Sequence, residues 1–196
     1  MSKSPKFDRE QVVAKATNLY WERGYHATSM RNLQDAIDMR PGSIYAAFGS
    51  KDGVFRESLE HYAEQSIGRF RAQRAAASSP LQALKNTVRQ VVIQSKTDAP
   101  SSMCMLVKTV AELTDNEAEL LEFAKAKLKS VEDAIAELIK EAQQAGEISA
   151  EKNAEHLARF VQVQIAGLRI YAKANDDAPL EQMISEMFES ITATVQ

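Results

Sequence analysis

The sequence predicts an all-α protein of about nine helices, with an N-terminal three-helix domain followed by a C-terminal helical bundle. Apolar residues recur at spacings of three and four along nearly the whole chain, which is the period of one buried helix face. No run of alternating β-branched residues bounded by hairpin turns interrupts this pattern. Capping residues precede several of the periodic segments, and Gly or Pro follows several of them.

Three short helices are expected within the first 50 residues, over 8–24, 28–38 and 41–48. Asp8 and Thr28 are good N-caps for the first two, and Pro41 suits the first position of the third. A gap of only three or four residues between the second and third helices is typical of a helix-turn-helix module. We therefore expect a DNA-binding domain over residues 1–50.

Six further helices are expected over 50–78, 81–92, 103–113, 121–142, 150–174 and 179–191. No internal repeat of fixed period relates them, which disfavours a solenoid. Residues 51–196 are therefore predicted to form one further helical domain.

Composition excludes several classes of protein. The chain has 196 residues, of which 44% are hydrophobic and 26% charged, so it can bury a substantial core. No apolar run approaches the roughly 20 residues of a membrane-spanning helix, and the N-terminal ten residues lack the apolar segment of a secretory signal. We therefore expect a cytoplasmic protein with no membrane partner. One Cys and three His are too few for most structural zinc sites, so no metal or cofactor is expected.

Charge is distributed unevenly along the chain. Residues 1–51 contain eight Lys or Arg against five Asp or Glu, a net charge of +3, whereas the remaining residues contain 16 against 22, a net charge of −6. A basic N-terminal segment on an acidic body is expected when one end of a molecule meets a polyanion.

The N-terminal motif makes this expectation specific. It runs Gly24-Tyr25-His26-Ala27-Thr28-Ser29 and continues as Gly42-Ser43-Ile44-Tyr45-Ala46-Ala47-Phe48-Gly49-Ser50-Lys51. Over about residues 8–56 the chain resembles the DNA-binding domain of the TetR family of bacterial transcriptional regulators. The resemblance implies a homodimer that binds double-stranded operator DNA and responds to a small-molecule inducer.

The resemblance also implies which residues meet DNA. Phosphate contacts are expected from Thr28, Ser43, Tyr45 and Lys51, and base or groove contacts from Arg40, Pro41 and Ala46. Because Gly42 and Ser43 are small, the start of the third helix could approach DNA closely. For three of these residues, a role other than DNA contact stays open.

The first alternative is that Thr28 only caps its helix, the second is that Tyr45 belongs to the core, and the third is that Lys51 is a solvated charge. Phe48 is expected to anchor the third helix in the core. Asp38 stands where the family usually has Gly, in a turn that commonly needs a positive φ.

Two apolar stripes on the last two helices are expected to form the dimer interface. These residues are Val161, Ile165, Leu168, Leu180, Ile184, Met187, Phe188 and Ile191. Ala166 and Gly167 would allow two helices to approach closely. The alternative is that the stripes belong to the core of one chain.

An effector pocket is expected in the C-terminal domain, as the resemblance implies. Its candidate residues are Tyr62, Phe70, Met103, Cys104, Met105, Lys108, Phe123 and Tyr171, with Glu112, Gln162 and Arg169 as further polar candidates. Cys104 lies in the expected first turn of a helix, where the helix dipole favours a thiolate and hence reaction with electrophiles. The alternatives are that the Met and aromatic residues are plain core and that Cys104 is a small buried apolar side chain between two methionines.

An all-α enzyme is the main rival function. The three His residues lack the Glu-x-x-His spacing of di-iron bundles, and no nucleophile elbow, Walker loop or dinucleotide-binding glycine motif occurs. We therefore expect a transcriptional regulator and not an enzyme. That it represses, and does not activate, follows only from what is usual in the family.

Overall fold

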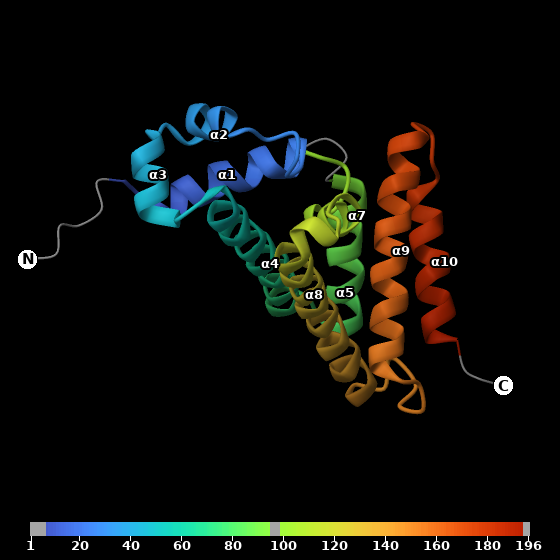
Figure 1. Cartoon of the computed structure of the whole chain (residues 1–196). Helices are drawn as coiled ribbons and strands as arrows, with labels where there is room; N and C mark the ends of the chain where they lie inside the picture. Colours follow the sequence, from blue (N-terminus) through green and yellow to red (C-terminus); the bar gives the residue numbers. More distant parts are fainter. Residues whose placement is uncertain (1–6, 95–98, 194–196) are drawn as a thin grey trace, which may run out of the picture. The chain divides into compact units, whose positions relative to one another are not determined.

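The computed structural model describes residues 7–94 and 99–193, and these are helical with no strand among them (Figure 1). The α-helices are α1 (Arg9–Arg23), α2 (Met30–Ile37), α3 (Pro41–Phe48), α4 (Lys51–Ala76), α5 (Pro80–Arg89), α7 (Met105–Glu112), α8 (Ala118–Gln144), α9 (Ala154–Ala174) and α10 (Leu180–Thr192). A π-helical turn η1 (Gln90–Gln94) extends α5, and a 3-10 turn η2 (Asp115–Glu117) precedes α8. The all-α prediction is confirmed.

The chain divides into two compact units. The first, here called the head unit, comprises Met1–Glu64 and Met105–Lys127. The second, the body unit, comprises Gln65–Cys104 and Leu128–Gln196. The head unit therefore contains α1, α2, α3 and α7 as well as parts of α4 and α8, more than the first 50 residues that the sequence suggests.

Local capping explains where the head-unit helices begin and end. The Asp8 carboxylate accepts hydrogen bonds from the backbone N–H groups of residues 10 and 11, as expected of an N-cap. α2 is capped by Ser29, whose side chain forms a reciprocal capping box with Asn32. The prediction that Thr28 caps this helix is therefore wrong by one residue. The Ser50 hydroxyl accepts a hydrogen bond from the Gly53 N–H and so starts α4.

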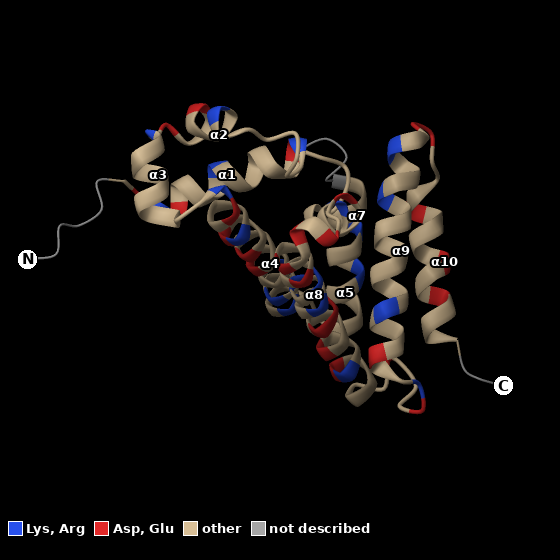
Figure 2. Ribbon diagram, in the orientation of Figure 1, with Lys and Arg blue, Asp and Glu red and all other residues tan. Residues whose placement is uncertain are grey.

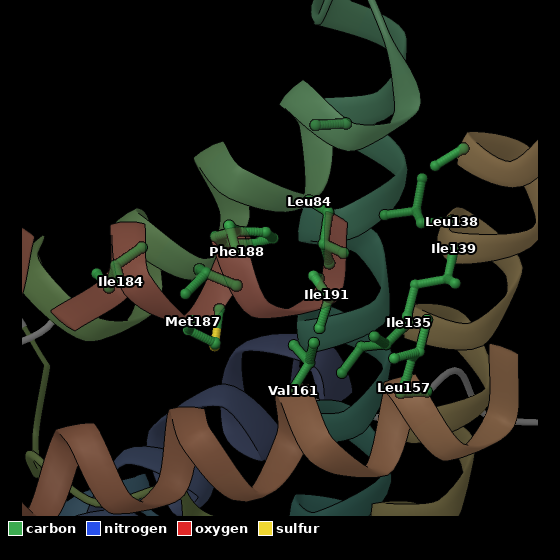
Figure 3. Close-up of a cluster of buried hydrophobic side chains, with 14 of the residues drawn as sticks. Leu84, Ile135, Leu138, Ile139, Leu157, Val161, Ile184, Met187, Phe188 and Ile191 are labelled. Carbon is green, nitrogen blue, oxygen red and sulfur yellow. The ribbon is translucent and has the colours of Figure 1, made fainter. Parts of the chain in front are cut away.

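In the body unit, one large apolar cluster joins α5, α8, α9 and α10. Figure 3 shows how Leu84 of α5, Ile139 of α8, Val161 of α9 and Phe188 of α10 point into the same cluster. Because these four side chains are all less than 5% exposed, this cluster is the hydrophobic core of the unit. Outside the cluster, α4 and α8 carry charges of both signs (Figure 2).

Candidate nucleic-acid interface

Helix α3 presents one face to solvent and buries the other. Ile44 and Phe48 are buried, at 0% and 8% exposed. The opposite face, with the residue before the helix, consists of exposed residues: Arg40, Pro41, Gly42, Ser43, Tyr45 and Ala46. The helix contains no Lys, Arg, Asp or Glu (Figure 2), so its exposed face offers hydroxyls, small side chains and the backbone N–H of Gly42.

Tyr45 has 53% of its surface exposed. This exposure rules out the alternative that Tyr45 is a core residue in the described structure. By contrast Phe48 is a core anchor as expected. Its ring lies 6.3 Å from that of Phe7, centroid to centroid, and the Arg9 guanidinium lies 4.5 Å above it.

Two further contacts hold the C-terminal end of α3. The Arg9 guanidinium donates to the Ala47 carbonyl, at 3.2 and 3.3 Å, and pairs with Glu57. A Cβ atom on Gly53 would lie 1.9 Å from the Phe48 carbonyl oxygen. The first turn of α4 can therefore approach the end of α3 only because residue 53 has no side chain.

The turn between α2 and α3 is built on Asp38. Its backbone is left-handed, with φ 53° and ψ 48°, and it is the one non-glycine residue with positive φ in the described chain. The expected positive φ is therefore confirmed. Asp tolerates this region better than most residues because its short polar side chain can bond locally.

Thr28 is fully buried. Its hydroxyl donates to the Gly24 carbonyl at 2.6 Å, and none of its surface is exposed. A side chain without exposed surface cannot reach a phosphate, so Thr28 is better described as closing the loop between α1 and α2 than as a DNA contact.

Lys51 is half-buried against Tyr25. Its Nζ donates to the Tyr25 carbonyl at 2.7 Å and lies 4.0 Å from the centroid of the Tyr25 ring. Burial lowers the pKa of the Lys51 ammonium, and the charges of Asp52 and Glu112 partly oppose this shift. One of its three N–H donors is used here, which leaves two for other acceptors.

The Tyr25 side chain is held equally closely. Its hydroxyl donates to an Asp52 carboxylate oxygen at 2.5 Å, and its ring lies 4.9 Å from that of Phe55. Burial, and then this hydrogen bond to Asp52, raise the pKa of Tyr25. Tyr25 lies within the N-terminal motif, but nothing in its residue type or spacing predicts this role.

Comparison with known proteins identifies the family of this chain. Residues 12–58 match the family described as "Bacterial regulatory proteins, tetR family", and residues 80–187 match "Tetracyclin repressor-like, C-terminal domain". The chain belongs to the TetR family. It is a helix-turn-helix transcriptional regulator.

Individual relatives in the TetR family extend over nearly the whole chain. The HTH-type transcriptional repressor ComR of Escherichia coli K12 is 26% identical over 180 residues, which cover 91% of this chain and 84% of ComR. The solved structure of a cysteine mutant of CifR, bound to a 26 bp double-strand operator DNA, superposes with a TM-score of 0.81 at 28% identity, covering 99% and 100% of the two chains. A TetR regulator from Chloroflexus aurantiacus gives a TM-score of 0.79 at 25% identity, with 95% of each chain covered.

The predicted effector residues of this TetR-family chain fall in both units. Tyr62, Met105, Lys108 and Phe123 lie in the head unit, and Phe70, Met103, Cys104 and Tyr171 lie in the body unit. Most are not free to meet a ligand as they stand. Tyr62, Phe70 and Met105 are at most 5% exposed. The Phe123 ring is covered by the Arg56 guanidinium at 4.6 Å and the Lys127 ammonium at 5.1 Å.

The polar effector candidates are engaged in intramolecular hydrogen bonds. Lys108 donates to backbone carbonyls at the end of α1, and Glu112 accepts from backbone N–H groups of residues 25 and 26. Arg169, 6% exposed, donates to the Ser102 carbonyl at 2.7 Å, and Gln162 donates to the carbonyl of residue 128. Tyr171 is 44% exposed on α9.

One cavity of the body unit lies between α4 and α8. Its volume is about 460 Å³, and its lining residues are Ile67, Phe70, Arg71, Arg74, Ala75, Ala134, Glu137, Leu138 and Glu141. Of the predicted effector residues it includes Phe70 alone. Arg74 and Glu141 pair across it at 2.5 Å.

The predicted dimer residues require a correction. Seven of them are at most 8% exposed and belong to the core of a single chain: Val161, Leu168, Leu180, Ile184, Met187, Phe188 and Ile191. Figure 3 shows Val161, Ile184, Met187, Phe188 and Ile191 in that core. Ile165 packs against the core half-buried. The seven buried side chains have almost no surface left for a partner. On α9 the prediction failed because the helix has two apolar faces, and periodicity alone does not tell which of them faces the core. On α10 the core takes up the whole predicted stripe.

The other apolar face of α9 is open to solvent. Val163, Ile170 and Tyr171 are 67%, 49% and 44% exposed, and Ala166 and Gly167 lie between them at helical spacing. We call these five residues the α9 outer stripe.

Of the helices that the structure describes, none is long and apolar enough to cross a membrane.

Proposed function

We propose that the chain is a homodimeric repressor that binds operator DNA through α3 and is released from it by a small-molecule or reactive-electrophile inducer. The observation that carries the DNA-binding part is the two-sided α3, anchored by Ile44 and Phe48 and exposed at residues 40–43, 45 and 46. The CifR relative supports it because that protein is described in complex with operator DNA. Such a protein works in the cytoplasm and catalyses no reaction.

Each exposed residue of α3 has a physical role in this proposal. Pro41 and Gly42 add little bulk at the helix N-terminus, so the Gly42 backbone N–H can approach a phosphate. The hydroxyls of Ser43 and Tyr45 donate to phosphate oxygens. Arg40 and Ala46 face base edges or the groove wall, where an Arg guanidinium reads guanine and an Ala methyl contacts thymine.

Lys51 remains a phosphate contact in the proposal, with its ammonium also bonded to the Tyr25 carbonyl. Thr28 is left out because it is buried. Removing the Lys51 charge should then reduce the salt dependence of DNA binding by about one unit of the log–log slope.

Dimerisation is proposed through the α9 outer stripe. An exposed apolar stripe with Ala166 and Gly167 at its centre suits close packing against the same helix of a second copy around a two-fold axis. A Cβ atom on Gly167 would meet no atom of the described residues within 4 Å apart from its neighbours in the same helix, so the described chain leaves room there for a partner. Two heads are needed because one short helix reads too few bases.

Repression is proposed because ComR is described as a repressor. The inducer must favour an arrangement of the DNA-binding domains that does not bind the operator, since a ligand with equal affinity for both arrangements does not shift the equilibrium between them.

Cys104 is half-buried and immediately precedes α7, so it is the candidate site for an electrophile. The 460 Å³ cavity beside Phe70 is large enough for a small apolar molecule.

The test is selection of DNA from random-sequence duplexes by the wild-type protein, followed by gel-shift titration. An enriched two-fold symmetric site supports the proposal, and failure to enrich any site overturns it. Tyr45→Phe should weaken binding to the selected site and to unrelated DNA about equally, and Ala46 variants should change which site is selected. Glu122→Gln, at an exposed position of α8 outside the proposed DNA and dimer surfaces, is the control and should leave DNA affinity unchanged.

A further inference from the structure

Helix α7 has two charged residues, Lys108 and Glu112, one turn apart on one face. The Lys108 ammonium donates to the carbonyls of Trp21 and Glu22, at 3.2 and 2.8 Å. These carbonyls belong to the last turn of α1, where carbonyl groups lack intrahelical partners. A cation there also meets the negative end of the helix dipole. Lys108 thus holds the C-terminal end of α1.

Glu112 holds the loop that follows α1. Its two carboxylate oxygens accept hydrogen bonds from the backbone N–H of Tyr25, at 3.0 Å, and of His26, at 2.7 Å. Hydrogen bonds to an ionised carboxylate are stronger than neutral ones. Successive backbone N–H groups that converge on one carboxylate form an anion-binding concavity, here filled by a side chain of the same chain.

Gly24 makes room for this carboxylate. Its φ is +90°, and a Cβ atom there would lie 2.5 Å from a Glu112 carboxylate oxygen. The left-handed backbone and the absent side chain are therefore both needed for Glu112 to reach the N–H groups.

The α1–α2 loop, which Glu112 binds, leads directly into the helix-turn-helix. The Tyr25 backbone is held at both ends of the residue, its N–H by Glu112 and its carbonyl by Lys51. Thr28 then closes the loop by bonding to the Gly24 carbonyl, and α2 begins two residues later. The path of the chain between α1 and α2 is thus set by side chains from α4 and α7.

We infer that Lys108 and Glu112 are positioning residues for operator binding, which hold α1 and the α1–α2 loop in the geometry that presents α2 and α3 to DNA. This inference rests on the proposed function. Neither residue touches DNA; each acts through backbone groups of residues 21–26. α7 has its own apolar anchors in Met105 and Leu106, both at most 1% exposed, so the helix keeps its place when the polar pair is removed.

The experiment measures operator affinity of Glu112→Ala, Glu112→Gln and Lys108→Met at a temperature where circular dichroism shows each variant folded. Loss of two charge-assisted hydrogen bonds should weaken operator binding by Glu112→Ala about tenfold or more. Glu112→Gln keeps one acceptor oxygen and should lose less. A purely structural role would lower the melting temperature and leave the affinity of the folded protein unchanged.

Glu122 and Lys125 provide the control, because they form an exposed ion pair on α8 within the same unit. Glu122→Ala and Lys125→Met should bind the operator as wild type does. Gly24→Ala should weaken binding, and adding Glu112→Ala should restore part of the loss by removing the clash between the new methyl group and the carboxylate.

The outcomes separate this inference from the proposed function. If wild type selects no DNA site, the proposed function fails. If wild type binds its site and the folded Lys108→Met and Glu112→Gln variants bind it equally well, the positioning role is overturned and the regulator function stands. Should Glu112→Ala fail to fold, these two milder variants decide the question.

Discussion

At the scale of single residues, backbone conformation limits what the head unit tolerates. Asp38 occupies a left-handed conformation that costs most L-residues about 1–2 kcal/mol. Gly53 sits in the first turn of a helix, where glycine is unfavourable by propensity, yet a Cβ atom there would strike a backbone carbonyl. Glycine therefore suits residue 38 because of its backbone conformation, and it suits residue 53 because a side chain there would clash.

Asp38→Gly should stabilise the protein. Glycine adopts the left-handed conformation without strain, so we expect the free energy of unfolding to rise by up to about 1 kcal/mol in urea denaturation. Asp35→Gly is the control, because it removes the same charge from an exposed position inside α2 and should cost about 0.5–1 kcal/mol. Equal effects of the two substitutions would show that charge, and not backbone strain, determines stability at residue 38.

Gly53→Ala should destabilise the protein by about 2 kcal/mol, because the new methyl group must displace the end of α3 or the start of α4. Gly68→Ala, later in the same helix, places its Cβ more than 4 Å from every described atom outside the adjacent part of the helix, and should stabilise the protein by up to about 1 kcal/mol. Thermal and urea unfolding of the two variants measure the difference. A stabilising Gly53→Ala would mean that helix propensity outweighs the contact with Phe48.

At the scale of elements, α9 shows how one helix can serve two partners. Val161 and Leu168 belong to the core of their own unit, and Val163 and Ile170 lie on the exposed side. The inner face stabilises the chain whatever its oligomeric state. The outer face has a use only if something covers it, and a second copy is the proposed partner.

Charge substitution on the two sides of the body-unit core should separate these roles. Ile170→Glu, on the outer stripe, should yield a folded monomer in sedimentation at micromolar concentration, because a carboxylate cannot be buried unpaired in an interface. Ile184→Glu, 3% exposed in the core, should lower the unfolding midpoint strongly. Ala72→Glu, at an exposed position of α4, is the control for added charge. A dimeric Ile170→Glu variant would exclude the α9 outer stripe as the interface.

At the scale of the whole molecule, the charge pattern suits selective and not indiscriminate binding to DNA. The chain carries a formal net charge of −3, although its first 51 residues carry +3. An acidic remainder opposes accumulation of the protein along DNA, so the proposed dimer has to gain its affinity from a specific site that both of its helix-turn-helix modules contact.

If the protein is the proposed symmetric dimer, its affinity for DNA should depend on both halves of the binding site. A duplex that carries both halves of the selected site should bind at least 100-fold more tightly than a duplex with one half, since each head adds its own contacts to a linked partner. Gel-shift titration at one fixed salt concentration measures the ratio. Ile170→Glu should reduce the advantage of the full site, and an unchanged ratio in a monomeric variant would contradict the two-headed arrangement.

The sequence by itself determined the fold class, the helix order and the family, because helical periodicity, caps and the motif over residues 24–51 are local features. It also determined the positive φ at Asp38 and the anchoring role of Phe48, which follow from the spacing of the motif. The tertiary structure decided which face of α9 is buried, because both faces are apolar and only packing against α5, α8 and α10 distinguishes them.

Packing likewise buried Thr28 and brought Lys108 and Glu112 to backbone groups more than 80 positions earlier in the chain. Backbone N–H and carbonyl groups are the same at every residue, so no sequence pattern marks the ones that a distant side chain will bind. For that physical reason the contacts that position the DNA-binding helices were visible only in three dimensions.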